Sequence, residues 1–168
     1  MAKMIKLILV RLVNDIYGWI SMMSAYQAYY KGTTFRTYEA LFQWLRFVGF
    51  PDIQWEIVEQ KSPMGAKMKA RKHRNKLNRG EKWDQAPEDI TLMKKCILLK
   101  LEQHPELKDK LNETGSATII EDCTSHDRES ARFWGMVYKD GKWIGENNLG
   151  KIWMEIRSDL QKTKTKKV

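Results

Sequence analysis

The sequence predicts a single α+β domain that is mainly helical and has few, short strands. Apolar residues recur at helical spacing in several segments, and these segments carry their own start and stop signals. Runs with strand character are brief and lie beside turn residues. With 168 residues, including seven Trp, six Tyr and five Phe, the chain is long enough to bury a substantial core as one domain. We place this domain at residues 1–161.

The first forty residues predict little regular structure. Residues 5–13 form an apolar run that favours a strand, although it is short enough to be the first turn of a helix. Residues 17–24 are rich in large side chains and predict an irregular segment. Residues 29–35 predict a short hairpin that turns at Lys31 and Gly32.

The following helix has the clearest signals in the sequence. Thr37 is suited to cap its N-terminus, Gly49 to end it, and Pro51 prevents its continuation. Nearly every residue between these points is apolar or aromatic, which predicts a helix packed inside the protein. The exceptions are Glu39, Gln43 and Arg46, which are spaced i, i+4 and i+7 and so share one face.

The middle of the chain predicts three more helices. Asp52 is expected to cap a short one over residues 53–60, and Ser62 followed by Pro63 starts a basic one at Met64. Residues 75–84 predict a mobile surface loop. The longest helix is expected over residues 87–104, with a buried stripe of Ile90, Met93, Ile97 and Leu101.

The last third alternates short elements with loops. We expect a helix over residues 105–111, a strand over 118–121 and a polar loop over 122–132. Residues 133–138 and 142–144 flank Asp140-Gly141, a favourable hairpin turn. The last helix is expected over residues 148–160, and the basic tail at 162–168 is expected to be disordered.

Composition favours a cytoplasmic protein. Cys96 and Cys123 are far apart and form no C-x-x-C pattern, which fits buried thiols in a reducing compartment. Arg11 and Asp15 interrupt the N-terminal apolar run too early for a signal peptide, and no window reaches membrane-spanning length.

The formal net charge of +9 is unevenly distributed. No acidic residue occurs between Lys61 and Arg79, and this segment favours a polyanionic partner or a phosphate-bearing substrate. A basic run that merely keeps the surface solvated is the alternative. The candidate nucleic-acid contacts are Lys69, Arg71, Lys72 and Lys76.

The polar face of Glu39, Gln43 and Arg46 has two interpretations. It is either a narrow solvent-facing edge or the lining of a polar pocket, because a helix with so many bulky residues has little surface left for water. Glu39 lies in the first helical turn, where the helix dipole favours an ionised carboxylate. Such a group suits the stabilisation of developing positive charge.

Other kinds of site find little support. Ser125, His126 and Asp127 are adjacent, whereas the side chains of a hydrolytic triad converge from distant segments. The histidines and cysteines lack metal-ligand spacing, so no metal is expected. No glycine-rich phosphate loop follows a strand, and no cofactor is expected.

Taken in order, the motifs resemble a known family. Residues 37–47 resemble the T-x-E-x-x-F-Q-x-x-[KR]-F signature of the NADAR superfamily, the YbiA-like proteins. The resemblance continues through residues 62–68 and 114–121. It closes with Asp127, Trp134-Gly135, Gly145, Asn147, Leu149-Gly150 and residues 154–157, and so covers the chain from about residue 17 to 160.

This resemblance implies a compact, mainly helical α+β fold with a central cleft, and metal-independent hydrolysis of N-glycosidic bonds to ribose. Some members paired with DNA-modifying toxins remove ADP-ribose from guanine in DNA, as antitoxin-like ADP-ribosylglycohydrolases. Others act on small ribosylated intermediates of riboflavin synthesis. The implied catalytic residues are Glu39 and Asp127. The implied substrate contacts are Trp19, Ser21, Gln43, Arg46, Trp134, Gly135 and Asn147, with Asn147 and Arg157 also as structural supports.

Two positions depart from the family pattern. The family has Ser-Asn before the first helix, where this chain has Ser21-Met22, and a Gly-Arg pair where this chain has Ala70-Arg71. The missing amide removes a hydrogen-bond donor, which implies an altered substrate scope. We therefore expect removal of ADP-ribose from guanine in DNA first, with a riboflavin intermediate or an inactive ADP-ribose-binding module as alternatives.

Overall fold

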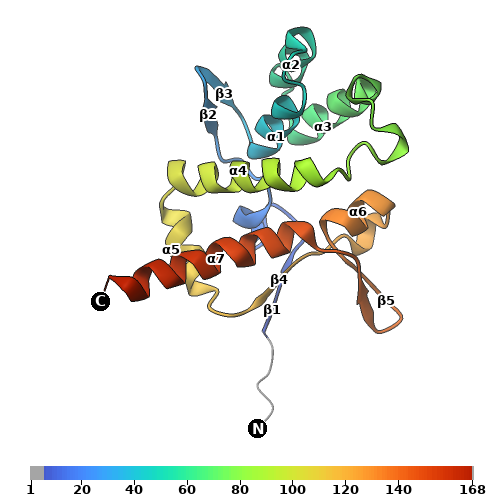
Figure 1. Cartoon of the computed structure of the whole chain (residues 1–168). Helices are drawn as coiled ribbons and strands as arrows, with labels where there is room; N and C mark the ends of the chain where they lie inside the picture. Colours follow the sequence, from blue (N-terminus) through green and yellow to red (C-terminus); the bar gives the residue numbers. More distant parts are fainter. Residues whose placement is uncertain (1–5, 168) are drawn as a thin grey trace. The chain divides into compact units, whose positions relative to one another are not determined.

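The computed structural model describes residues 6–167. Its elements form two compact units, and each is described by itself. One unit is continuous and contains residues 19–103, whereas the other combines the chain up to Gly18 with the chain from His104 onward. Helices dominate and the strands are short, so the predicted class, α+β and mainly helical, is confirmed (Figure 1).

The continuous unit begins with a one-turn 3₁₀ helix at the boundary, η1 (Gly18–Ile20), followed by the predicted hairpin. Strand β2 (Ala28–Tyr30) pairs antiparallel with β3 (Thr33–Phe35). Lys31 and Gly32 connect them with φ values of 46° and 80°. A turn with two positive φ angles matches the twist of the strands, and glycine adopts one of them without strain.

Helix α1 (Tyr38–Arg46) begins as predicted, because the Thr37 side chain accepts a hydrogen bond from the backbone N–H of Ala40. Helix α2 (Pro51–Val58) begins earlier than expected. Pro51 occupies its first turn and Phe50 is the N-cap, so the prediction that Asp52 caps this helix is wrong. A proline in the first turn sacrifices no helical hydrogen bond, which explains the earlier start.

Helix α3 (Pro63–Lys72) begins at the predicted cap, where Ser62 accepts a hydrogen bond from the N–H of Gly65. It packs against both α1 and α2 (Figure 1). Its buried side consists of the small residues Ala66 and Ala70, which allow a close approach.

The segment at residues 75–84 differs from the predicted mobile loop. It contains two short 3₁₀ helices, η2 (Arg74–Leu77) and η3 (Gly80–Lys82), and Trp83 beyond them is only 7 % exposed. The buried indole fixes this segment against the unit. Helix α4 (Pro87–Gln103) then closes the unit, with Met93, Ile97 and Leu101 buried as predicted and Ile90 only partly so.

The discontinuous unit is built on a parallel strand pair. Strand β1 (Leu7–Val10) pairs with β4 (Thr118–Glu121), so a strand forms in each predicted segment. The first is shorter than the predicted 5–13, because residues 11–13 are outside it, and Ile5 lies outside the described residues. Helix α5 (Glu106–Glu113) precedes β4, and the last helix, α7 (Asn148–Lys166), packs against β4 and α5. The helix predicted as longest, α4, is in fact shorter than α7.

Three predictions near the C-terminus differ from the structure. The polar loop contains a 3₁₀ helix, η4 (Thr124–His126), and helix α6 (Glu129–Trp134), so Phe133 and Trp134 are helical and do not begin a strand. The hairpin is shorter than expected and joins β5 (Val137–Lys139) to β6 (Lys142–Ile144) through Asp140-Gly141. Helix α7 continues to Lys166, so the tail predicted as disordered is helical there, since residues 161–166 contain no helix breaker.

Candidate active site

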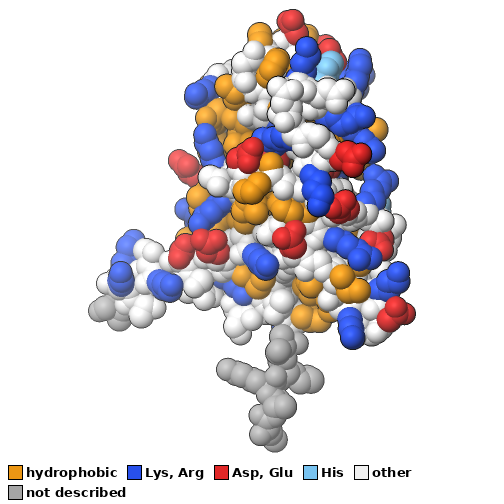
Figure 2. All heavy atoms as spheres, turned by 45° about the vertical axis from the view of Figure 1, so that its right-hand side comes forward, with side chains coloured by type: hydrophobic (Ala, Val, Ile, Leu, Met, Phe, Trp, Pro, Cys, Tyr) orange, Lys and Arg blue, Asp and Glu red, His pale blue; other side chains and the backbone are white. Residues whose placement is uncertain are grey.

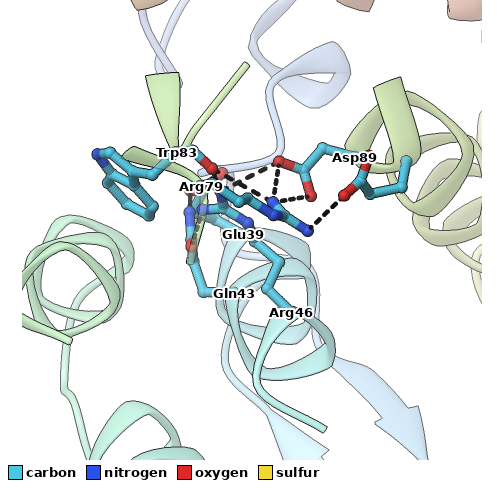
Figure 3. A network of polar contacts seen from close by, with 7 residues as sticks. Glu39, Gln43, Arg46, Arg79, Trp83 and Asp89 are labelled. Atoms are coloured by element: carbon cyan, nitrogen blue, oxygen red, sulfur yellow. Dashed lines mark hydrogen bonds and ion pairs between the residues drawn. The ribbon is translucent and has the colours of Figure 1, made fainter. Parts of the chain in front are cut away.

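The polar face of α1 points into the protein. Glu39, Gln43 and Arg46 are 7 %, 3 % and 8 % exposed, so the interpretation as a solvent-facing edge is wrong. Figure 3 shows their side chains converging with residues from the start of α4 and the segment before it. The polar face of α1 is therefore part of a buried polar cluster and not a surface that keeps the helix in contact with water.

Hydrogen bonds connect the three side chains in series. Gln43 Nε2 donates to Glu39 Oε1 at 2.8 Å, and Arg46 Nη1 donates to Gln43 Oε1 at 3.0 Å. Because the guanidinium has only donors, it fixes which end of the Gln43 amide faces Arg46. The amide nitrogen must then face Glu39, and the carboxylate is held in one orientation at the N-terminal turn of α1.

Arg46 is in turn held by residues outside α1. Its Nη2 donates to the carbonyl of Trp83 at 2.7 Å and to Asp89 Oδ2 at 3.1 Å, and its guanidinium lies 4.5 Å from the centre of the Trp83 ring. Arg79 binds both carboxylate oxygens of Asp89 (Figure 3). Burial lowers the pKa of Arg46, and the neighbouring Asp89 opposes that shift.

This geometry bears on the predicted role of Arg46. Both of its Nη groups already donate to protein acceptors, so contact with a substrate phosphate or ribose would compete with Gln43, Trp83 and Asp89. Within the continuous unit, the structure brings together Glu39, Gln43 and Arg46 as a positioned carboxylate and its supports. Direct substrate contact by Arg46 stays a prediction.

The predicted contacts Trp19 and Ser21 lie in the loop before the hairpin. The carbonyl groups of both residues accept hydrogen bonds from Lys100 Nζ, at 2.6 Å and 3.0 Å. Their loop also reaches the catalytic candidate, because the backbone N–H of Glu39 donates to the carbonyl of Met22 at 2.9 Å. Trp19, Ser21 and Glu39 are therefore connected through the backbone.

Sequence reasoning missed Asp89 and Lys100, the two buried charged residues of α4. They are 1 % and 0 % exposed. A signal was present: Asp89, Met93, Cys96 and Lys100 follow one another at intervals of four, three and four residues, so the charges share the apolar face. A charge at such a position is either paired or hydrogen-bonded when buried.

Burial shifts two pKa values on this face of α4. It raises the pKa of the Cys96 thiol to about 12, with a further contribution from the charge of Glu39. It lowers the pKa of the Lys100 ammonium to about 7. Cys96 is a buried free thiol, as expected, and Cys123 is also free but only partly buried.

The second predicted carboxylate, Asp127, belongs to the discontinuous unit. Arg132 donates to both of its oxygens, at 2.7 Å and 2.8 Å, and the hydrogen bond from Arg132 lowers the pKa of Asp127. The Asp127 side chain is 39 % exposed. The same unit contains Trp134, which is half-buried and packs edge-on against Phe133 with ring centres 5.0 Å apart.

Gly135 and Asn147 have structural roles that are visible in this unit. A side chain on Gly135 would lie 2.2 Å from the carbonyl oxygen of Glu121, so only glycine fits. Asn147 has a left-handed backbone, and its amide bridges the carbonyl of Ile119 and the N–H of Glu121 on β4. Arg157 likewise donates to Thr114 and to the carbonyl of Ala117, consistent with the support predicted for it.

The candidate nucleic-acid contacts are not equivalent. Lys69 lies 3.6 Å from Glu56, whose pKa is lowered chiefly by a hydrogen bond from His73. Arg71 and Lys72 are exposed on α3, and Lys76 is exposed on η2. One face of α3 carries exposed residues at spacing i, i+3, i+4, i+7 and i+8, and we call it the α3 stripe: Met64, Lys67, Met68, Arg71 and Lys72.

Two other kinds of feature are absent from the part of the chain that the structure describes. Residues 6–167 contain no group of three or more His, Cys, Asp or Glu side chains arranged to hold a metal ion. None of the helices in that range is both long enough and apolar enough to span a membrane.

Known proteins resemble this chain in sequence and in structure. A family model described as the NADAR domain matches residues 13–161. The N-glycosidase YbiA of Escherichia coli (strain K12) is 31% identical over 147 residues, which cover 88% of this chain and 84% of YbiA. An N-glycosidase of Acanthamoeba polyphaga mimivirus is 34% identical over 87 residues, or 47% of each chain.

A solved structure agrees with these sequence matches. The NMR structure of the Escherichia coli protein YbiA has a TM-score of 0.69 to this chain at 28% sequence identity. The alignment covers 96% of this chain and 89% of that chain. The similarity therefore includes the elements of both units.

Proposed function

The chain belongs to the NADAR domain family, and from this premise we propose that it is an N-glycosidase that removes ADP-ribose from guanine bases in DNA. The observation that carries the glycosidase part is the buried carboxylate of Glu39, oriented by Gln43 at the N-terminal turn of α1. An antitoxin role beside a DNA-modifying toxin is part of the same proposal.

The chemistry needs a fixed negative charge near the anomeric carbon. Cleavage breaks the bond between that carbon and a guanine nitrogen through an oxocarbenium-like state. Water then supplies the oxygen of the new C–O bond, one of its protons leaves to a base, and guanine takes up a proton. A preoriented carboxylate stabilises the developing positive charge without having to reorganise.

Glu39 fits the role of this carboxylate better than that of a proton donor. The helix dipole at the first turn of α1 favours the anion, and the Gln43 amide donates a hydrogen bond to it. Asp127 is the candidate for the second carboxylate and is held by Arg132.

The α3 stripe supports a DNA substrate. Within residues 6–167 the structure records no ion pair for Lys67, Arg71 or Lys72, so these cations are available to phosphates. Met64 and Met68, 52 % and 51 % exposed, lie between them and offer apolar contact to bases or sugars. Lys69 contributes less because Glu56 already neutralises it.

The test of the DNA proposal compares two substrates. Wild-type protein and a triple variant, Lys67→Gln, Arg71→Gln and Lys72→Gln, are assayed on ADP-ribosylated single-stranded DNA and on ADP-ribosylated guanosine over a range of salt concentrations. We expect the activity of the variant on DNA to fall about tenfold or more. The slope of the logarithm of DNA affinity against the logarithm of salt concentration should become shallower by roughly 0.7 for each lost phosphate contact. Hydrolysis of the nucleoside should change little.

A matched control removes the same number of charges elsewhere. The control variant combines Lys162→Gln, Lys164→Gln and Lys166→Gln, at three lysines in the exposed last turns of α7. It should leave the activities on DNA and on the nucleoside intact. Equal losses on DNA for both triple variants would mean that net charge alone matters. If the α3 variant lost equal activity on DNA and on the nucleoside, these cations would act at the substrate pocket or stabilise the fold. The DNA proposal would then lose its main support.

A small ribosylated riboflavin intermediate is the second candidate. Figure 2 shows basic, acidic and hydrophobic side chains intermixed on the visible face, without one broad basic patch of the kind common in DNA-binding proteins. This proposal expects rapid cleavage of the small substrate and no action on DNA. Binding of ADP-ribose without cleavage of any substrate would instead support the inactive module suggested by Met22.

A further inference from the structure

Lys100 is the most deeply buried charged side chain that the structure describes, with 0 % of the residue exposed. Its ammonium donates to the carbonyl of Trp19 at 2.6 Å, to the carbonyl of Ser21 at 3.0 Å and to Ser24 Oγ at 3.1 Å. An ammonium has three N–H donors, and here each has an acceptor. All three acceptors belong to one short loop, residues 19–24.

Aromatic rings complete the environment of this ammonium. Its Nζ lies 4.9 Å from the centre of the Tyr26 ring and 5.9 Å from that of Tyr38. Ring faces attract a cation and offset part of its desolvation. Tyr38 is itself fully buried, immediately precedes Glu39 on α1, and donates through its hydroxyl to Gln103 at 2.8 Å. The ammonium is thus enclosed between the loop and the start of α1.

The loop of residues 19–24 is closed by its own hydrogen bonds. Ser24 donates to the carbonyl of Ser21 through both its N–H and its hydroxyl, at 3.2 Å and 2.6 Å. The N–H of Met23 donates to Ser21 Oγ at 3.2 Å. The same Ser21 carbonyl accepts from Lys100, so removal of Lys100 would leave the loop with a buried acceptor only partly satisfied.

The loop meets α1 at the catalytic candidate. The N–H of Glu39, one of the helix donors without a partner inside α1, donates to the carbonyl of Met22 at 2.9 Å. This contact uses the backbone of Met22, whose side chain is 3 % exposed and points into the core. The contact is therefore independent of the side chain that departs from the family pattern.

We propose that Lys100 is a positioning residue for glycosidic cleavage, which holds the loop of residues 19–24 in the conformation that presents Trp19 and Ser21 to the substrate beside Glu39. The proposal rests on the proposed N-glycosidase function. Lys100 does not touch the substrate in this arrangement, because its Nζ is buried and its three donors are used. It acts through the loop, and a misplacement of about 1 Å in such a loop can lower the rate about 10²-fold.

The experiment compares Lys100→Met, which keeps the length of the side chain and removes its donors, with Lys100→Arg and Lys95→Met. Lys95 is an exposed lysine on the same helix whose Nζ donates to the Tyr30 hydroxyl. Hydrogen exchange of residues 19–24 and the steady-state hydrolysis of ADP-ribosylated guanosine are measured at a temperature where circular dichroism shows each variant folded.

We expect faster exchange in residues 19–24 and a loss of about 10²-fold in kcat/KM for Lys100→Met, partial recovery for Lys100→Arg, and no change for Lys95→Met. A folded Lys100→Met variant with wild-type kcat/KM would overturn the proposal, whatever its hydrogen exchange. If Lys100→Met does not fold, Ser24→Ala takes its place, because it removes one acceptor of the Lys100 ammonium and the hydrogen bond from the Ser24 hydroxyl to the Ser21 carbonyl. Hydrogen exchange and kcat/KM should then change in the same direction but by less. An unchanged kcat/KM would again overturn the proposal.

Failure of the proposed function gives a different result. A wild-type protein that cleaves no N-glycosidic substrate would refute that function, and ADP-ribose affinity then replaces the rate as the measurement. Weaker ADP-ribose binding by Lys100→Met together with faster exchange in residues 19–24 would support the positioning role. Equal binding by the two proteins would refute it.

Discussion

Arg46 and Asp89 form an ion pair at 3.1 Å although both side chains are only 1 % exposed. Arg79 completes the cluster from the partly exposed side, where Glu88 lies 3.3 Å from its other nitrogen. Two cations therefore share one buried carboxylate. A buried charge without a partner is far more costly than an exposed one, so the cluster depends on Asp89.

Replacing Asp89 with Asn should therefore destabilise the protein strongly. The substitution keeps the shape of the side chain but leaves the guanidinium of Arg46 buried without a counter-charge. We expect the free energy of unfolding to fall by about 3 to 5 kcal/mol, as for other broken buried pairs. Urea unfolding followed by tryptophan fluorescence measures this change.

Glu88→Gln is the matched control for that experiment. Glu88 contacts the same Arg79, but its side chain is 64 % exposed, and exposed pairs contribute below about 1 kcal/mol. If the two variants lost equal stability, the cluster would not behave as a buried ion pair.

Replacing Glu39 with Gln should abolish hydrolysis while leaving the fold intact. The new amide can still accept the hydrogen bond from Gln43, so only the charge is removed. A loss of about 10²-fold or more in kcat fits an electrostatic role for one group. Steady-state kinetics on ADP-ribosylated guanosine, with the exposed Glu59→Gln as control, tests this. Normal turnover in a folded Glu39→Gln protein would exclude Glu39 as the catalytic carboxylate.

The stability of the protein should rise with pH just above neutrality. The pKa of Lys100 is about 7 in the folded state and about 10.5 for an exposed lysine. Between pH 7 and 10.5 the unfolded chain therefore binds one more proton than the folded protein. The free energy of unfolding then increases by up to about 1.4 kcal/mol per pH unit, or about 2 kcal/mol from pH 7 to 9. Urea unfolding at several pH values measures the slope.

Lys100→Met should remove this slope, and a slope that persists in the variant would assign it to another group. Above pH 9 an opposing effect is expected from Cys96, whose pKa rises from 9.0 to about 12 on folding. The folded protein then binds the extra proton, and stability falls as pH increases. Cys96→Val should remove that decline.

Replacing Asp127 with Asn separates its pairing with Arg132 from a catalytic role. Both side chains are more than a third exposed, so the loss of the pair should barely move the thermal midpoint. We expect kcat to fall about 10²-fold or more if Asp127 acts as the second carboxylate. Arg132→Gln removes the same pair but keeps the carboxylate; equal kinetic losses in the two variants would indicate that only the pairing matters.

The features predicted correctly depend on residues close together in the sequence. Thr37 caps α1 through an N–H three residues away, Ser62 does the same for α3, and Lys31-Gly32 turns its hairpin within two residues. Asp140-Gly141 is equally local. Caps and tight turns are determined by short stretches of chain, so their signals can be read without the rest of the fold.

The errors around the candidate site involve partners far apart in the sequence. Residues 75–84 looked like a loop because nothing local shows that Trp83 is buried and that its carbonyl binds Arg46 on α1. Similarly, the role of Lys100 depends on carbonyls about 80 residues earlier. The sequence indicated that Glu39 and Gln43 share a face, but not that Asp89 and Lys100 support the site.

The pairing of β1 with β4 also bears on how the chain folds during synthesis. Residues 7–10 find their partner only at residues 118–121, whereas residues 19–103 contain every element of their own unit. On a ribosome, the continuous unit can therefore fold before residues 118–121, the partner of the first strand, have been synthesised. We expect nascent chains stalled soon after residue 103 emerges to resist protease in residues 19–103 but to remain cleavable before residue 18. Proteolysis of such stalled chains would reveal the order.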